Sequence, residues 1–235
     1  FTRLARVERI NDPDLSGWNR CSLEQEWRAS TNRSVSPPYS LHSRLVSGGL
    51  SQSPAVRATI TLPPLLLGEN AKLKFKHWIH SEVHKNTTRA FDGGIVEFSK
   101  DNGVSFQQLK GPYTHTIYGW TYSPWPDGTP CLAGKGTDDW SEVTFDLMRE
   151  YPDQNGFHGQ EVIFRFHYGG DNNTDNEGWY IDDVSVSPLL WRQGFCNNIE
   201  PAYNHVITPG QNKRIFWYNQ PTGMSLRDDN LTVFL

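Results

Sequence analysis

Two short runs of the sequence have side chains at a spacing that could bind a metal ion. In the first run, His80, Glu82 and His84 alternate with Ser81 and Val83. On an extended strand such alternate side chains share one face, and two imidazoles with a carboxylate suit zinc or iron. The helical H-E-x-x-H zinc motif is absent. The alternative for this run is a surface strand end with two exposed histidines.

The second run is the acidic pair Asp182 and Asp183. Neighbouring residues on a strand point to opposite faces, so both can bind one ion only if a bulge intervenes. Buried, clustered carboxylates need a partner to stay ionised. The pair therefore indicates either an ion ligand or a solvated strand edge.

A third group of residues is aromatic. The segment from Gly111 to Thr137 is rich in Gly, Pro, Tyr and Trp and has no hydrophobic period. Exposed aromatic planes stack on sugar rings or anchor protein interfaces. The same rings could instead cover an open end of the fold, and both interpretations stand. The candidate ligand-binding residues are Tyr113, Tyr118, Trp120, Tyr122 and Trp125.

Catalytic motifs are absent from the sequence. There is no G-x-S-x-G elbow, no P-loop and no G-x-G-x-x-G. Paired carboxylates for glycoside chemistry need a spacing in three dimensions that a sequence does not show. The sequence therefore favours binding or support over catalysis, and a polysaccharide-acting enzyme is the rival hypothesis.

The charge and hydropathy patterns exclude other function classes. The net charge is -4, and the nearest basic run, Lys72 to Lys76, alternates charged and apolar residues as a strand with one solvated face does. No apolar stretch approaches the ~20 residues of a membrane span. We expect neither a nucleic-acid partner nor a membrane span.

The elements that must position these residues are predicted to be strands. The 12 Phe, 9 Tyr and 9 Trp favour pleated surfaces, and 15 Pro and 20 Gly interrupt the chain too often for long helices. Asn102-Gly103 predicts a type I′ turn between strands at 95–99 and 104–106. The other predicted strands span Val56 to Leu62, Leu73 to Ile79, Glu142 to Leu147, Val162 to Tyr168 and Trp179 to Val186.

The chain changes character after Pro188. Asn-rich turns are followed by two candidate strands, at 214–218 and 231–235. We predict a main domain over residues 1–187 and a C-terminal β extension, or the start of a second domain, over residues 188–235. The predicted fold class is all-β, a jelly-roll β-sandwich with this appended β-rich tail.

Several short motifs follow one another in a characteristic order and spacing. They are Leu15 to Trp18, Trp27 and Tyr39 to Leu41 near the start, Phe91 to Ser99 with Asp101 to Phe106, Val162 to Phe166 followed by Asp171, and Gly178 to Val186. Together they resemble the MAM-like jelly-roll domain of immune inhibitor A metallopeptidases and other secreted bacterial proteins, over roughly residues 5–187. The sequence departs from the family pattern at Asn102, where a glycine is usual, and at Phe106, where a tryptophan is usual.

The resemblance implies a structural calcium ion, because carboxylates and carbonyls are the hard oxygen donors that calcium prefers. The opening strand would supply Glu8 or Asp12. The other implied ligands are Glu82, Asp92, Asp182 and Asp183.

The expected function is a non-catalytic, calcium-stabilised accessory or binding module of a secreted hydrolase or cell-surface protein. It would recognise a glycan or a protein partner, including the catalytic domain of the same protein. A structural subunit of an extracellular assembly is a further alternative. Three cysteines, Cys21, Cys131 and Cys196, permit at most one disulfide within the chain and leave its pairing open.

Overall fold

The computed structural model describes residues 4–8, 19–21, 27–44, 56–136, 139–171, 174 and 176–190. In this part of the chain the secondary structure is almost entirely β. The elements are β1 (Leu4–Glu8), β2 (Asn19–Cys21), β3 (Trp27–Ser30), β4 (Ser40–Ser43), β5 (Val56–Thr61), β6 (Leu65–His80), β7 (Arg89–Ala90), β8 (Gly93–Ser99), β9 (Gln107–Gln108), β10 (His115–Ile117), β11 (Pro130–Cys131), β12 (Ser141–Asp146), α1 (Leu147–Glu150), a 3-10 helix η1 (Pro152–Phe157), β13 (Glu161–Gly170) and β14 (Gly178–Leu189).

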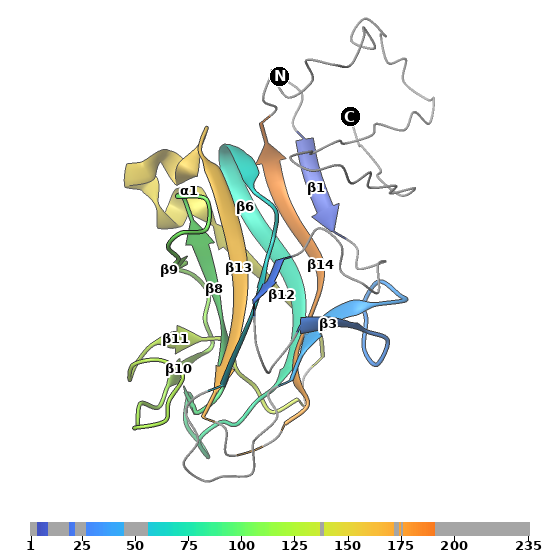
Figure 1. Cartoon of the computed structure of the whole chain (residues 1–235), viewed down its shortest axis with the longest axis vertical. Coiled ribbons are helices and arrows are strands. Elements are labelled where there is room, and N and C mark those ends of the chain that lie inside the picture. Colours follow the sequence, from blue (N-terminus) through green and yellow to red (C-terminus); the bar gives the residue numbers. More distant parts are fainter. Residues whose placement is uncertain are drawn as a thin grey trace, which may run out of the picture.

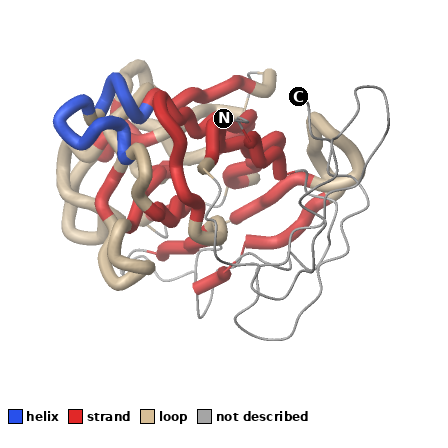
Figure 2. The backbone as a smooth tube through the Cα atoms, turned by 90° about the horizontal axis from the view of Figure 1, so that it is seen from above, coloured by secondary structure: helices blue, strands red, loops and turns tan. Residues whose placement is uncertain are grey.

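Most of the strands form two antiparallel layers, and β7, β10 and β11 form a separate three-stranded sheet in which β7 and β10 are parallel. In the layer that we call sheet A, β14 lies between β6 on one side and β1 and β4 on the other, with β12 outside β6 and β3 outside β4. In sheet B, the order is β2, β5, β13, β8, β9. Figure 1 shows the long strands β6, β13 and β14 running along the longest axis, and Figure 2 shows the strands from above. The predicted all-β jelly-roll sandwich is confirmed.

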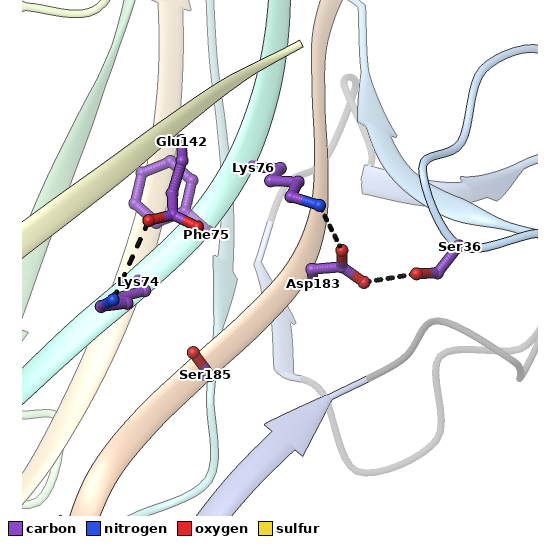
Figure 3. A pocket seen from close by; sticks show the side chains of 7 residues that line it. All are labelled: Ser36, Lys74, Phe75, Lys76, Glu142, Asp183 and Ser185. Carbon is purple, nitrogen blue, oxygen red and sulfur yellow. Dashed lines mark hydrogen bonds and ion pairs between the residues drawn. The ribbon is translucent and has the colours of Figure 1, made fainter.

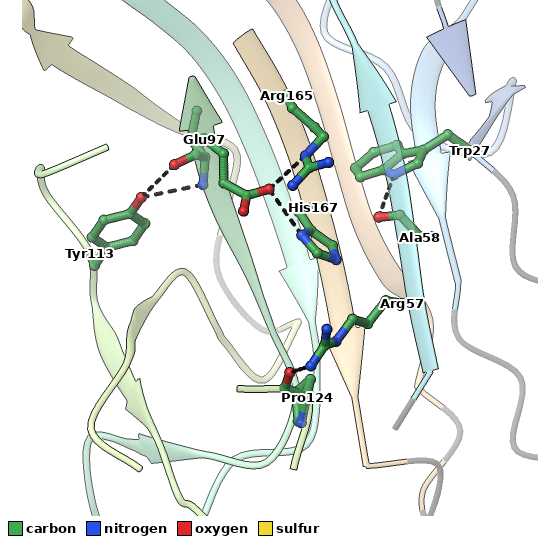
Figure 4. Close-up of polar contacts among 9 residues, drawn as sticks. Trp27, Arg57, Ala58, Glu97, Tyr113, Pro124, Arg165 and His167 are labelled. Carbon is green, nitrogen blue, oxygen red and sulfur yellow. Dashed lines mark hydrogen bonds and ion pairs between the residues drawn. The ribbon is translucent and has the colours of Figure 1, made fainter. Parts of the chain in front are cut away.

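The two sheets are joined at one corner and by aromatic packing. At the corner, Leu65 and Leu66 at the start of β6 pair with the start of β13. Inside, Trp179 of sheet A packs edge-on against Phe166 of sheet B at 5.9 Å between ring centroids. Trp27 is fully buried, and its indole N–H donates to the carbonyl of Ala58 across the layers at 3.2 Å (Figure 4). Burial of such large rings supplies most of the driving force for closing the sandwich.

The predicted strands are confirmed in β5, β6, β8, β12, β13 and β14, each with bounds within a few residues of those expected except β6, which is much longer. In β6, Leu73 and Phe75 are buried, whereas Lys74 is exposed and Lys72 half-buried. The alternation of charged and apolar residues thus marks one wet and one dry face, as predicted.

The hairpin between β8 and β9 is confirmed, with a longer connection than predicted. Asn102 and Gly103 have the positive φ values of 58° and 86° that the type I′ turn requires. Pairing does not resume until Phe98 meets Gln107, however, so Val104 to Phe106 is not a strand. Asp101 is the reason: its carboxylate accepts hydrogen bonds from the backbone N–H and the hydroxyl of Ser105 and so closes a wider turn.

The last strand extends beyond the predicted domain boundary at residue 187. In β14, Leu189 pairs with Leu67 of β6, and the N–H of Leu190 donates to the carbonyl of Leu66. The predicted strands at 214–218 and 231–235 lie outside the described residues, and the division of the chain into two parts stays a prediction.

The approach of β8 to Trp179 leaves no room for a side chain at Gly94. A Cβ atom there would lie 2.4 Å from the indole ring. We therefore expect Gly94→Ala to lower the free energy of unfolding by roughly 1–3 kcal/mol, as overpacking does, measured by chemical denaturation.

The matched test is the double variant Gly94→Ala/Trp179→Phe. The smaller ring leaves space for the new methyl group, so the double variant should lose less stability than the sum of the two single variants. Strict additivity would show that the contact does not limit this position.

Candidate functional site

Three carboxylates from three segments of the chain meet at one end of the sandwich. Glu82 follows β6, Asp92 lies between β7 and β8, and Asp171 follows β13 directly. Because β8 and β13 are antiparallel and Gly93 pairs with Gly169, the start of one strand and the end of the other coincide. One ligand oxygen from each of the three side chains lies within 4.8 Å of the others. We call this group the carboxylate trio.

Asp92 is the centre of the trio. Its Oδ2 accepts the backbone N–H of Glu82 at 3.2 Å, and its Oδ1 accepts the backbone N–H of Asp171 at 3.2 Å. The backbone N–H groups of Phe91 and Asp92 in turn donate to the carbonyl of Glu82. These bonds fix the three chain segments to one another independently of the side chains of Glu82 and Asp171.

The electrostatics of the trio are unfavourable for three ionised groups. Asp92 is only 4% exposed. Burial, and secondly the charge of Asp171, raise the pKa of Asp92 to about 8. Burial and the same neighbour also raise the pKa of Glu82. Oε2 of Glu82 is buried and has no hydrogen-bond partner among the described residues. A proton on Asp92 or a cation among the three groups would relieve this repulsion.

The donor set of the trio fits calcium. All three side chains offer hard carboxylate oxygens, and the trio is the one compact grouping of His, Cys, Asp or Glu found across the described ranges. Calcium binds oxygen ligands in flexible geometry, whereas zinc prefers imidazole or thiolate. Thr174 hydrogen-bonds the carboxylate of Glu82, but its buried Oε2 has no partner among the described residues, which suits a positive partner at this place.

The acidic pair of β14 does not join the trio, which corrects the ligand set implied by the sequence. Asp182 pairs with Lys76, whereas Gly178 pairs with His80 at the end of β6. Four residues of strand therefore separate the pair from that end, a distance of roughly 13 Å. Glu8 pairs with Val184 and so lies along β14 beside the pair, not near Glu82. The alternative ligand Asp12 lies outside the described residues.

Asp182 instead anchors the chain segment before β4. Its Oδ2 accepts the backbone N–H groups of Val35 and Ser36 at 2.7 and 3.0 Å, and its Oδ1 accepts the N–H of Asp183. A bulge does intervene, because the register shifts after Asp182 and Asp183 has a φ of 50°. Both carboxylates therefore face the same segment, and protein donors satisfy them without an ion.

Asp183 lies in a shallow cavity of about 320 Å³ on the outer face of sheet A (Figure 3). It accepts the hydroxyl of Ser36 at 2.6 Å and pairs with Lys76 at 3.2 Å. Lys74 in the same cavity pairs loosely with Glu142 at 3.9 Å. The charges that line this cavity thus pair with one another.

The histidines near Glu82 do not form the predicted zinc face. β6 ends at His80, so the extended geometry that would align His80, Glu82 and His84 is lost after that residue. His84 is exposed, and its ring lies parallel to that of Tyr118, with 5.7 Å between centroids. The alternative of a strand end with surface histidines fits this arrangement better, while Glu82 turns to the trio.

The aromatic segment forms a closed loop that connects β10 and β11. Near its ends, the N–H of Gly119 donates to Asp127 at 2.7 Å, and Arg89 pairs with the same carboxylate. In its middle, the side chain of Arg57 donates to the carbonyl of Pro124 (Figure 4). We call residues 118–129 the aromatic loop. These contacts hold it in one conformation.

Trp120 links the aromatic loop to the carboxylate trio. Its indole N–H donates to Oδ2 of Asp171 at 3.2 Å, while 41% of the residue is exposed. Tyr122 packs edge-on against it at 5.0 Å. Tyr118 is 43% exposed and lies near the ring of Phe91, with 5.4 Å between centroids. The predicted ligand-binding residues Trp120, Tyr118 and Tyr122 therefore share one loop beside the trio.

Tyr113 does not belong to this surface, which is a second correction. Its hydroxyl exchanges hydrogen bonds with the backbone of Val96, and its ring packs against the core residue Phe145 at 5.7 Å. Burial raises the pKa of its hydroxyl group above the usual value. Tyr113 lies before β10 and outside the loop that carries the exposed rings, and its hydroxyl and its ring are both engaged with the sandwich.

Trp125 is an anchor between the aromatic loop and sheet B. Its ring is partly buried and meets that of His167 edge-on at 5.2 Å. Glu97 accepts hydrogen bonds from His167 at 3.0 Å and from Arg165 at 2.7 Å (Figure 4). Burial lowers the pKa of His167 despite this carboxylate. The network holds the underside of the loop, so Trp125 positions the exposed rings rather than contacting a ligand.

Asp171 is the site residue that the sequence analysis did not assign. It appeared only as part of a family motif, because nothing local marks it as a ligand. The available signal is its place directly after the two glycines that end β13, as Asp92 directly precedes the two glycines that begin β8. Recognising the match requires the pairing of those strands, which the sequence does not state.

Two further findings concern the wider molecule. Cys131 is a free, buried thiol whose pKa burial raises to about 12, so it is not a reactive nucleophile. Within the described ranges, no helix has the length and apolar character that crossing a membrane requires.

Comparisons with known proteins give only remote similarities. No protein-family model matches the sequence, and no curated protein matches it. Among solved structures, the K2 cleaved adhesin domain of Lys-gingipain is 14% identical with a TM-score of 0.47, covering 77% of this chain and 97% of that one. TmCBM61 in complex with β-1,4-galactotriose is 10% identical with a TM-score of 0.43, covering 76% and 92%.

The CBM22-1 xylan-binding domain of Xyn10C from Paenibacillus barcinonensis is 7% identical with a TM-score of 0.42, covering 80% of this chain and 96% of that one. At these values the similarities carry no argument about the site, which rests on the geometry of this chain.

The role of Asp182 as an anchor predicts an asymmetry between two neighbouring acids. Asp182→Asn leaves one oxygen where the carboxylate held three N–H groups, so we expect a loss of roughly 2 kcal/mol in the free energy of unfolding. Asp183→Asn, at a partly exposed ion pair, should cost less than about 1 kcal/mol. Equal losses in chemical denaturation would contradict the anchoring role.

Proposed function

We propose that the chain is a non-catalytic, calcium-stabilised β-sandwich module of the MAM-like type that binds glycan through its aromatic loop. Its place would be in a secreted hydrolase or a cell-surface protein. The observation that carries the proposal is the hydrogen bond from the half-exposed indole of Trp120 to Asp171, a member of the carboxylate trio. A ring suited to a sugar and a group suited to a cation thus form one unit.

The cation part of the proposal rests on charge and burial. Glu82, Asp92 and Asp171 come from three chain segments, and in the folded state their oxygens gather within 4.8 Å. When bound, calcium would supply the positive charge that offsets their repulsion and would hold the three segments together. The backbone bonds to Asp92 orient its carboxylate, so this part of the site is prepared before an ion binds.

The glycan part rests on exposure and order. Trp120 and Tyr118 are the large aromatic residues of the described ranges that remain more than 40% exposed. The contacts at Asp127, Pro124 and Trp125 order the loop that carries them. An ordered ring loses little conformational entropy when it stacks on the apolar face of a sugar. A protein partner, including a catalytic domain of the same protein, would use the same rings as anchors.

The non-catalytic part rests on the state of the acidic groups. A glycosidase needs an acid and a base that flank the scissile bond. In the trio, Asp92 is only 4% exposed, and both its oxygens accept backbone N–H groups. Asp171 accepts the indole N–H of Trp120, and Asp127 accepts the backbone N–H of Gly119 and pairs with Arg89. This arrangement favours holding a cation over transferring a proton to a polysaccharide.

Calcium should stabilise the folded chain. With free calcium at 100 times its dissociation constant, the gain is about 2.7 kcal/mol, because the ion binds only the folded state. For a domain of this size that corresponds to a rise of roughly 5–10 °C in Tm over the value in EDTA. Thermal unfolding with EDTA, then with calcium or zinc restored, measures the effect.

Two variants make the calcium test specific. Asp92→Asn should abolish the calcium-induced rise in Tm, because it removes the central charge. Glu142→Gln, an exposed acid outside the trio, should leave the rise unchanged. An unchanged Tm of the wild-type chain in EDTA and in calcium would rule out the cation site. A rise in Tm with zinc alone would indicate that His80 and His84 bind the metal.

Trp120 should dominate glycan affinity. Trp120→Ala is expected to weaken binding to the preferred polysaccharide by tenfold or more, as loss of about 1.4 kcal/mol or more from an anchor residue does. Calorimetry and affinity electrophoresis with soluble xylan, galactan, mannan and β-glucan provide the measurement. Tyr113→Phe is the matched control, because that ring packs against the core away from the aromatic loop and the change should leave affinity unchanged.

The same panel tests the alternatives. Absence of binding to every polysaccharide would contradict the glycan proposal, and a protein partner would then be the remaining ligand for these rings. Release of reducing ends from any polysaccharide would favour the enzyme hypothesis over the binding module.

A further inference from the structure

Asp171 takes part in two separate sets of contacts. On one side its carboxylate belongs to the trio with Glu82 and Asp92. On the other side its Oδ2 accepts the indole N–H of Trp120 at 3.2 Å. Its backbone N–H is also held, by Oδ1 of Asp92 at 3.2 Å. The carboxylate of Asp171 therefore connects the trio to the ring of Trp120, while Asp92 holds its backbone N–H.

The direction of this carboxylate depends on the charge inside the trio. Without a cation, carboxyl oxygens of Asp171, Glu82 and Asp92 lie within 4.8 Å of one another, so like charges on these groups repel each other. With a cation, the same neighbours and the ion hold the carboxylate toward the trio. The indole of Trp120 follows Asp171 in either case, because a charge-assisted hydrogen bond is strong and directional.

The rest of the aromatic loop stays in place while Trp120 responds. Trp125 is held by the His167 and Glu97 network, and Gly119 by Asp127, on sides of the loop that do not touch the trio. The backbone N–H of Trp120 donates to Ser123 Oγ at 2.9 Å, which fixes its main chain as well. A change at Asp171 is thus passed to the ring of Trp120 and not to the whole loop.

We propose that cation occupancy of the carboxylate trio sets the orientation of Trp120, so that the cation and a ring-stacking ligand bind cooperatively. This inference rests on the proposed function, since it assigns regulation to the same site. Asp171 is the coupling residue, and Trp120 acts as a positioning residue toward the cation while it contacts the ligand. By linkage, whatever factor calcium adds to ligand affinity, the ligand must add to calcium affinity.

The test measures the cation and the ring without any glycan. Trp120→Phe keeps an aromatic plane but removes the donor to Asp171. Loss of such an outer partner of a metal ligand typically weakens metal binding by 10–100-fold, and for this half-exposed indole we expect about tenfold, measured by calcium calorimetry on the whole chain. In EDTA, Tm should match that of the wild type.

Tryptophan fluorescence supplies the second readout. Addition of calcium to the wild-type chain should change its emission and the accessibility of tryptophan to acrylamide. Both changes should disappear in Trp120→Phe and persist in Trp140→Phe, which removes a half-buried tryptophan from the segment before β12. This control separates the response of Trp120 from a general effect of calcium on the fold.

The outcomes distinguish this inference from the proposal beneath it. If calcium does not bind the wild-type chain, the proposals of the cation site and of the coupling are both wrong. If calcium binds, and Trp120→Phe retains both the wild-type affinity and the fluorescence change, the coupling is overturned while the calcium site stands. Loss of the fluorescence change together with weaker calcium binding supports the coupling.

Discussion

The carboxylate of Asp92 is the interaction on which the functional end of this molecule depends. It is a buried carboxyl group, which is costly unless it is hydrogen-bonded, and its two oxygens accept backbone N–H groups from two other chain segments, ten and 79 residues away in sequence. The two segments begin where β6 and β13 end, so one side chain fixes the exits of strands from both sheets. The carboxylate trio exists because this anchor draws Glu82 and Asp171 to the same place.

The fold could be predicted well because its signals are local and repeated. The alternation in Lys72 to Phe75 gave one face of β6, and Asn102-Gly103 gave a turn whose φ values match. The length of the β8–β9 connection was missed because it depends on how one side chain, Asp101, caps its neighbours. Periodicity states which residues are buried, whereas caps and bulges depend on individual hydrogen bonds.

The site was predicted only in part, and the reason is strand register. The structure brings Glu82 and Asp92 together, as expected, whereas Asp182, Asp183 and Glu8 lie elsewhere along β14. These acids lie at or near strand ends or at a bulge, and their local sequences do not state which of them meet. Their positions are separated by the pairing of Gly93 with Gly169 and of Asp182 with Lys76, and these pairs join residues far apart in the sequence. Likewise, the aromatic segment contains both Tyr113, which packs against the core, and Trp120, which is 41% exposed, and composition alone does not distinguish them.

The double anchoring of the aromatic loop has a consequence for how such a module could diversify. Arg89, Arg57 and His167, all residues of strands, contact Asp127, Pro124 and Trp125, respectively. The side chains at 120–122 are not part of the hydrophobic core of the described residues. Substitutions at those three positions would therefore alter the shape offered to a ligand at little cost to folding, and a library of variants limited to them would sample new specificities on an unchanged scaffold.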